Sequence, residues 1–152
     1  MPRTIAPHVH REVPVLQHGT SVADAVGRVV DSGLPALPVV DADGHYLGIF
    51  GERELITALF PGYVRSLGHA AFVKKSLESV LKKRSECLGE PVEKHMNREH
   101  VDVEVDFSDL QLAEIFIHHR VLIVPVTEDG RVTGVVTRTD FFRALAELLP
   151  DP

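Results

Sequence analysis

The residues with the clearest chemistry lie in the segment Gly134-Val135-Val136-Thr137-Arg138-Thr139-Asp140. An apolar run typical of a strand ends at Thr137 and a helical pattern follows, so Thr137 can cap that helix and Asp140 lies one turn further along, facing the same way. An ionised carboxylate at this position can accept hydrogen bonds from hydroxyl groups of a ligand. Thr137, with the free N–H groups of the helix start, suits a hydroxyl or phosphate oxygen of a ligand, and Arg138 can add a cation.

A structural interpretation competes with this one, because a capping hydroxyl followed three residues later by an acidic residue occurs at many helix starts. Such a capping box more often carries Glu or Gln than Asp at its acidic position. Here the segment also follows an apolar run and an Asp-Gly turn at Asp129-Gly130. We therefore interpret Asp140 as the best single candidate for a site residue.

The segment belongs to an internal repeat, and a repeat decides the architecture. Sliding the sequence by 87 positions aligns residues of the same type in a fixed order. The pairs include Arg11 with Arg98, Ser21 with Ser108, and Pro38 with Pro125. After a one-residue gap in a turn the offset becomes 86 and pairs Asp43-Gly44 with Asp129-Gly130, and Gly48 with Gly134.

Each copy predicts the same succession of elements, because a serine can cap a helix and Asp-Gly between apolar runs favours a hairpin. In the first copy we expect strands over 13–16, 37–40 and 46–50, a helix from Ser21 to Gly33, and a closing helix over 53–60. In the second we expect strands over 101–105, 121–126 and 132–136, a helix after Ser108 with His119 on its apolar face, and a closing helix over 139–148. The predicted fold class is therefore α/β (α+β), with the unit β-α-β-β-α occurring twice.

A segment without a counterpart separates the two copies. We expect the first repeat over 1–60, a helical insertion or linker over 61–90, and the second repeat over 91–152. The insertion predicts a helix over 68–84 whose polar side is basic, and we interpret that side as a solvated face. Its basic residues are Lys74, Lys75, Lys82, Lys83 and Arg84.

The two copies together resemble a CBS domain pair, also called a Bateman module, here expected to stand alone. The motifs that carry the resemblance are Leu34-Pro35-Ala36-Leu37-Pro38-Val39-Val40-Asp41 and Val121-Leu122-Ile123-Val124-Pro125-Val126, each followed by an Asp-Gly hairpin and then by Gly48-Ile49-Phe50 or Gly134-Val135-Val136. The resemblance implies two units packed about a pseudo-twofold axis. It also implies binding of AMP, ADP, ATP or S-adenosylmethionine between the units, a regulatory role and no enzymatic activity.

The segment from Gly134 to Asp140 matches the family's ribose-phosphate motif, and the resemblance also implies an apolar slot for the adenine base. It places the slot at Val101, Val103, Val121, Leu122 and Ile123 of the second repeat. Ordinary core packing is the competing interpretation, and we favour it for Val121 and Val124. In the first repeat Gly51 and Glu54 replace the hydroxyl residue and the aspartate, and Glu52 adds a second acidic side chain that would repel a phosphate. We expect the first site to be weak or empty.

Composition excludes several classes of function. The chain has 152 residues, 16 Lys and Arg against 22 Asp and Glu, and a formal net charge of −6, which disfavours nucleic acid and anionic lipid as partners. With no apolar run long enough for a membrane span, and Cys87 as its one cysteine, the chain is expected in the cytoplasm. The nine histidines show no convincing metal-ligand spacing, and known catalytic motifs are missing, so we expect neither a metal, nor a required cofactor, nor an enzyme.

The predicted function is that of a regulatory or sensor module that binds one adenosine nucleotide per chain through the second repeat and signals to an unknown protein partner. The alternative is a scaffold that dimerises without any ligand. In either case we expect a homodimer built from helices of both repeats. Its candidate contacts are Leu55, Leu59, Phe141, Phe142, Leu145 and Leu148, with Phe72 in the insertion.

Overall fold

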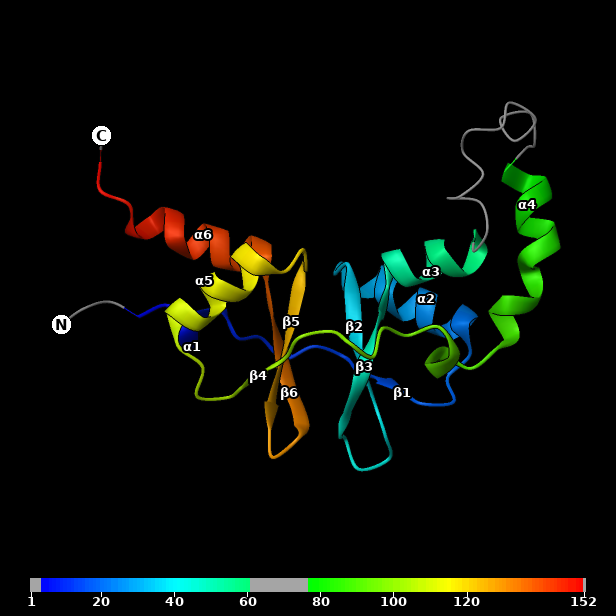
Figure 1. Cartoon of the computed structure of the whole chain (residues 1–152), viewed down its shortest axis with the longest axis horizontal. Helices are drawn as coiled ribbons and strands as arrows, with labels where there is room; N and C mark the ends of the chain where they lie inside the picture. Colours follow the sequence, from blue (N-terminus) through cyan, green and yellow to red (C-terminus); the bar gives the residue numbers. More distant parts are fainter. Residues whose placement is uncertain (1–3, 61–76, 152) are drawn as a thin grey trace.

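The computed structural model describes residues 4–60 and 77–151 and contains two three-stranded sheets, one for each repeat (Figure 1). The first sheet has the order β1 (Leu16–Gln17), β2 (Ala36–Val40), β3 (Tyr46–Gly51). The second has the order β4 (Val103–Glu104), β5 (Ile123–Glu128), β6 (Arg131–Thr137). In both sheets the first two strands are parallel and the last two antiparallel. The sheets share a small core of Ala36, Ile49, Ile123 and Val135.

The helices of each repeat cover the outer side of its own sheet (Figure 1). They are α2 (Val22–Ser32) and α3 (Glu52–Leu59) in the first repeat, and α5 (Asp109–His118) and α6 (Arg138–Leu148) in the second. Ser21 and Ser108 cap α2 and α5 as predicted, each accepting a backbone N–H at 3.1 Å. Gly33 ends α2 with φ of 71°, a conformation that glycine adopts without strain. The repeated β-α-β-β-α architecture is confirmed.

The two segments that lead into the repeats cross over, which the sequence did not predict. Helix α1 (Ala6–Val9) lies beside α6, and Ile5, Ala6 and Val9 are buried in the core of the second repeat. Conversely, Val92 and Met96, which precede the first strand of the second repeat, are buried in the core of the first repeat. Figure 1 shows the blue N-terminal segment running from one unit to the other before it reaches β1.

Backbone pairing of these lead-in segments corrects the repeat alignment by one residue. Arg11 exchanges two 2.9 Å hydrogen bonds with Val135, whereas Asn97 exchanges bonds of 2.8 and 3.0 Å with Ile49. Since Val135 and Ile49 are 86 positions apart, the structural counterpart of Arg11 is Asn97 rather than Arg98. A side chain on Gly134 would collide with the Arg11 carbonyl oxygen, so glycine is needed for this close approach.

The segment between the repeats is described from Leu77 onwards. It contains α4 (Leu77–Arg84) and the short 3-10 helix η3 (Ser85–Gly89), both beside the first repeat. A second 3-10 helix, η4 (Val92–Lys94), opens the second repeat. The rest of the expected helix, with Phe72, Lys74 and Lys75, lies outside the described residues. Arg84 does not belong to a solvated face, because its Nη2 donates to the Ala58 carbonyl oxygen at 2.8 Å and ties α4 to α3.

Two predictions about apolar helix positions are wrong. Phe141 does not face outward: it is buried in the core of the second repeat, with its ring centroid 5.4 Å from that of Phe116. His119 does not share the apolar face of α5, because the helix ends at His118 and His119 is exposed.

Within the described ranges, the helices are too short or too polar to cross a lipid bilayer.

Candidate ligand-binding site

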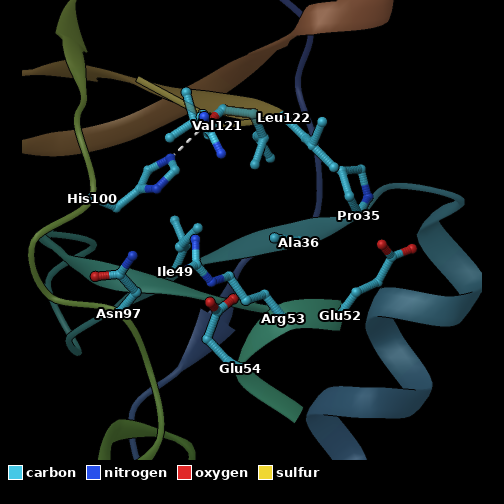
Figure 2. A pocket seen from close by; sticks show the side chains of 12 residues that line it. Pro35, Ala36, Ile49, Glu52, Arg53, Glu54, Asn97, His100, Val121 and Leu122 are labelled. Atoms are coloured by element: carbon cyan, nitrogen blue, oxygen red, sulfur yellow. Dashed lines mark hydrogen bonds between the residues drawn. The ribbon is translucent and has the colours of Figure 1, made fainter. Parts of the chain in front are cut away.

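Two cavities lie where the two repeats meet. We call the larger one the Asp140 cavity; it has a volume of about 520 Å³ and is lined by Arg11, Gly33, Leu34, Pro35, Glu52, Leu122, Thr137, Arg138, Thr139, Asp140 and Arg143. We call the smaller one the Glu54 cavity; it has a volume of about 120 Å³ and is lined by Pro35, Ala36, Ile49, Glu52, Arg53, Glu54, Asn97, His100, Arg120, Val121, Leu122 and Ile123 (Figure 2). Each cavity combines the strand-to-helix junction of one repeat with the segment preceding the second strand of the other.

The junction between β6 and α6 has the local geometry that the sequence predicts. The buried Thr137 hydroxyl oxygen accepts the backbone N–H of Asp140 at 3.0 Å, so Thr137 is the N-cap of α6. The Asp140 carboxylate, however, does not complete a capping box. Its Oδ2 accepts from Arg11, with Nε at 2.8 Å and Nη2 at 2.6 Å. The carboxylate is therefore held at the cavity rather than against the first turn of the helix.

The charges around the Asp140 cavity favour an anionic ligand. Three arginines, Arg11, Arg138 and Arg143, line it against two acidic residues, Glu52 and Asp140. The N-terminus of α6 adds partial positive charge at the same place. Oriented cations and a helix start are the groups that bind phosphate. The arrangement thus offers a carboxylate for hydroxyl groups and several cations for an anion in one cavity.

The five residues of the predicted base slot do not lie together in the structure. Leu122 borders both cavities, but Val121 and Ile123 line only the Glu54 cavity. Val103 is buried in the core of the second repeat, and Val101 packs against that core. Of the five residues assigned to the slot, Leu122 alone lines the Asp140 cavity, and the position of the base stays a prediction.

The apolar wall that faces Asp140 comes from the other repeat, at Leu34 and Pro35. The physical reason is the packing of the sheets, which brings the segment before β2 over the start of α6. Sequence reasoning missed these two residues and Arg11. Leu34 and Pro35 could have been found as the repeat counterparts of Val121 and Leu122, whereas the role of Arg11 depends on the crossed lead-in segment.

The Glu54 cavity differs from its larger counterpart in its electrostatics. Figure 2 shows Glu52, Arg53 and Glu54 on one side and His100, Val121 and Leu122 on the other. Burial raises the pKa of Glu54 and lowers that of His100, so both environments favour the neutral form. The Nε2–H of His100 donates to the Ile123 carbonyl oxygen at 2.6 Å. Asn97 occupies in this cavity the position that Arg11 occupies in the Asp140 cavity, so there is no arginine at that position.

One further group of side chains has the spacing of a metal site. Ligand atoms of Asp41, Asp43 and His45, in the turn between β2 and β3, lie within 4.8 Å of one another. Asp41 already accepts the backbone N–H groups of Asp43 and His45 at 2.9 Å, and the pKa of its carboxyl group is lowered chiefly by the bond from His45. These contacts explain the group as part of the turn.

The fold defines a protein of two pseudo-symmetric domains with two cavities where they meet. The chain belongs to the CBS domain family, since the CBS domain matches residues 5–61 and 92–147. The crystal structure of the CBS-domain containing protein ATU1752 from Agrobacterium tumefaciens is 27% identical, with a TM-score of 0.67 over 93% of this chain and 90% of that one.

Two other similar proteins extend the comparison. The crystal structure of CBSX2 in complex with AMP has a TM-score of 0.70 over 97% of this chain and 98% of that one, at 20% identity, which shows the shared fold. An A-adding tRNA nucleotidyltransferase from Aquifex aeolicus is 29% identical over 135 residues. This match covers 88% of the chain but only 13% of the length of that enzyme.

Proposed function

We propose that this chain is a regulatory module that binds one adenosine nucleotide, AMP, ADP or ATP, in the Asp140 cavity. The observation that carries the proposal is the Asp140 cavity itself, which joins a carboxylate, a helix N-terminus and three arginines across the boundary between the repeats. The AMP bound to CBSX2, a protein of the same fold, supports the choice of ligand.

The chemistry of the Asp140 cavity suggests how such a ligand would lie. The Asp140 carboxylate accepts from the ribose hydroxyls, while Thr137, Arg138 and the start of α6 face the phosphate. The base packs against apolar groups of Leu34, Pro35 and Leu122, since burial of a flat apolar surface favours a purine. S-adenosylmethionine is the less favoured ligand, because its sulfonium charge would approach a group of arginines.

We propose a regulatory mechanism without a catalytic step. A ligand that touches both repeats stabilises the arrangement in which they form one cavity, and this shift of population alters a surface that a partner protein reads. The alternative is a scaffold whose paired repeats associate without any ligand. The Glu54 cavity lacks the cation that corresponds to Arg11, which argues against a nucleotide in the first site. This difference does not argue against a nucleotide in the Asp140 cavity.

A thermal-shift screen with adenosine, AMP, ADP, ATP and S-adenosylmethionine tests the proposal. A ligand at 100 times its Kd adds about 2.7 kcal/mol to the free energy of unfolding. For a domain of this size that raises the melting temperature by roughly 5–10 °C. We expect a shift with at least one of the three nucleotides. No shift with any ligand would favour the scaffold.

We also propose that the chain forms a homodimer through its outer helices. Leu110 and Ile117 of α5 and Phe142 of α6 are 82%, 76% and 69% exposed, and Val30 and Ile56 are exposed on α2 and α3. Such a density of large apolar side chains on helix surfaces is typical of an interaction surface. Of the contacts predicted from sequence, Phe142, Leu145 and Leu148 are exposed, whereas Leu55 and Leu59 are half-buried.

Leu145→Asp is expected to dissociate this dimer, because it would place an unpaired charge in a desolvated contact. Light scattering should give about twice the 16.8 kDa chain mass for the unmodified protein and the chain mass for the variant. Val105→Asp is the matched control, since Val105 has the same 42% exposure but lies outside the helices. A monomer at micromolar concentration before any substitution would contradict the proposal.

A further inference from the structure

The position of the Arg11 backbone is fixed independently of the ion pair that its side chain forms with Asp140. Its N–H and carbonyl groups pair with Val135 on β6, and Gly134 leaves room for this approach. The residue therefore has a defined position relative to the end of β6 and the start of α6. Its side chain is 47% exposed, so the guanidinium can change partners without any movement of the backbone.

The Arg11 guanidinium uses only one oxygen of Asp140. Both Nε and Nη2 point to Oδ2, and within residues 4–60 and 77–151 no group donates a hydrogen bond to Oδ1. One carboxylate oxygen is thus free for a hydroxyl group, and the other is shared with a cation. A ligand that takes both oxygens must displace Arg11.

Displacement has different consequences for a neutral ligand and for an anionic one. A neutral nucleoside would replace the ion pair with hydroxyl bonds and leave Arg11 without a counter-charge in the cavity. A phosphorylated nucleoside offers Arg11 a phosphate oxygen while its ribose takes Asp140, so charge pairing is kept. We infer that Arg11 is a specificity-determining residue that exchanges Asp140 for the ligand phosphate and makes the Asp140 cavity selective for phosphorylated ligands. This inference rests on the proposed function.

The Glu54 cavity supports this assignment by contrast. There the structural counterpart of Arg11 is Asn97, and Glu54 stands in place of Asp140. An amide cannot form the ion pair, and the arginines that line the smaller cavity, Arg53 and Arg120, come from other positions of the fold. Arg98, the counterpart of Arg11 in the sequence alignment, is exposed, lines neither cavity, and donates to the Glu93 carbonyl oxygen at 3.4 Å.

The test compares the affinities for AMP and adenosine in Arg11→Gln, measured by titration calorimetry on the full chain. For the unmodified protein we expect AMP to bind more tightly than adenosine. In the variant, AMP affinity should fall by about 10- to 30-fold, because one charge-assisted contact is lost. Adenosine affinity should stay the same or increase, since no ion pair has to be broken. Arg98→Gln removes the same charge outside the cavities and should leave both affinities unchanged.

Each outcome has a distinct meaning. A fall in the AMP to adenosine affinity ratio, with an unchanged melting temperature of the free protein, supports the exchange. Equal losses for both ligands, or a ratio unaffected by Arg11→Gln, would overturn the inference while leaving the proposed function intact. If the unmodified chain binds none of adenosine, AMP, ADP and ATP, the proposed function itself fails, and the inference fails with it.

Discussion

Replacing Asp140 with alanine is expected to lower the affinity for an adenosine nucleotide by about 10- to 100-fold. The substitution removes one or two charge-assisted hydrogen bonds to the ribose, each worth roughly 1.5–3 kcal/mol. The fold should be little affected, because the ion pair that is lost with Arg11 is partly exposed to solvent. Titration calorimetry with AMP, ADP and ATP would measure both the affinity and the number of sites per chain.

Glu54→Ala is the matched control for this variant, since Glu54 follows its strand in the first repeat as Asp140 does in the second. We expect it to change nucleotide affinity little, because the Glu54 cavity is small and its carboxyl group is in an environment that favours the neutral form. Two equal sites per chain, or an Asp140→Ala variant with unchanged affinity, would contradict the assignment of the site.

Val9→Asp is expected to destabilise the second repeat strongly, although Val9 lies near the start of the chain. Its side chain is 4% exposed and belongs to the same core as Val124 and Phe141. An aspartate there would bury an unpaired charge and remove apolar packing, at a cost of about 3–5 kcal/mol. Domains of this kind have a free energy of unfolding of about 5–15 kcal/mol, so chemical denaturation should show the loss clearly.

His8→Asp provides the comparison, because His8 lies on the same short helix but is exposed. It should lower stability by much less. Hydrogen exchange gives a second measurement: in Val9→Asp the amides of β5 should exchange faster, whereas those of β2 should change less. If the two variants were equally stable, the N-terminal segment would not be part of the second core.

The amino-acid sequence by itself determined the elements of this protein, because the interactions that define them are local. Ser21 caps a helix through an atom three residues away, and Thr137 reaches Asp140 over the same distance. The Asp129-Gly130 turn forms because these two residues adopt φ of 52° and 80°, which few other pairs tolerate. Repetition of such local signals also predicted two units of the same architecture and the single carboxylate most suited to a ligand.

Only the tertiary structure decided which groups meet at that carboxylate. Arg11 reaches Asp140 across 129 positions of sequence, and Leu34 and Pro35 reach the same cavity from the other repeat. These contacts depend on how the two sheets pack and on the crossing of the lead-in segments. Neither produces a periodic pattern in the sequence. Aligning Arg11 with Arg98, because both are arginine, gave the wrong structural counterpart. The register of this segment is set by backbone pairing and by the space at Gly134, and not by the identity of the side chain.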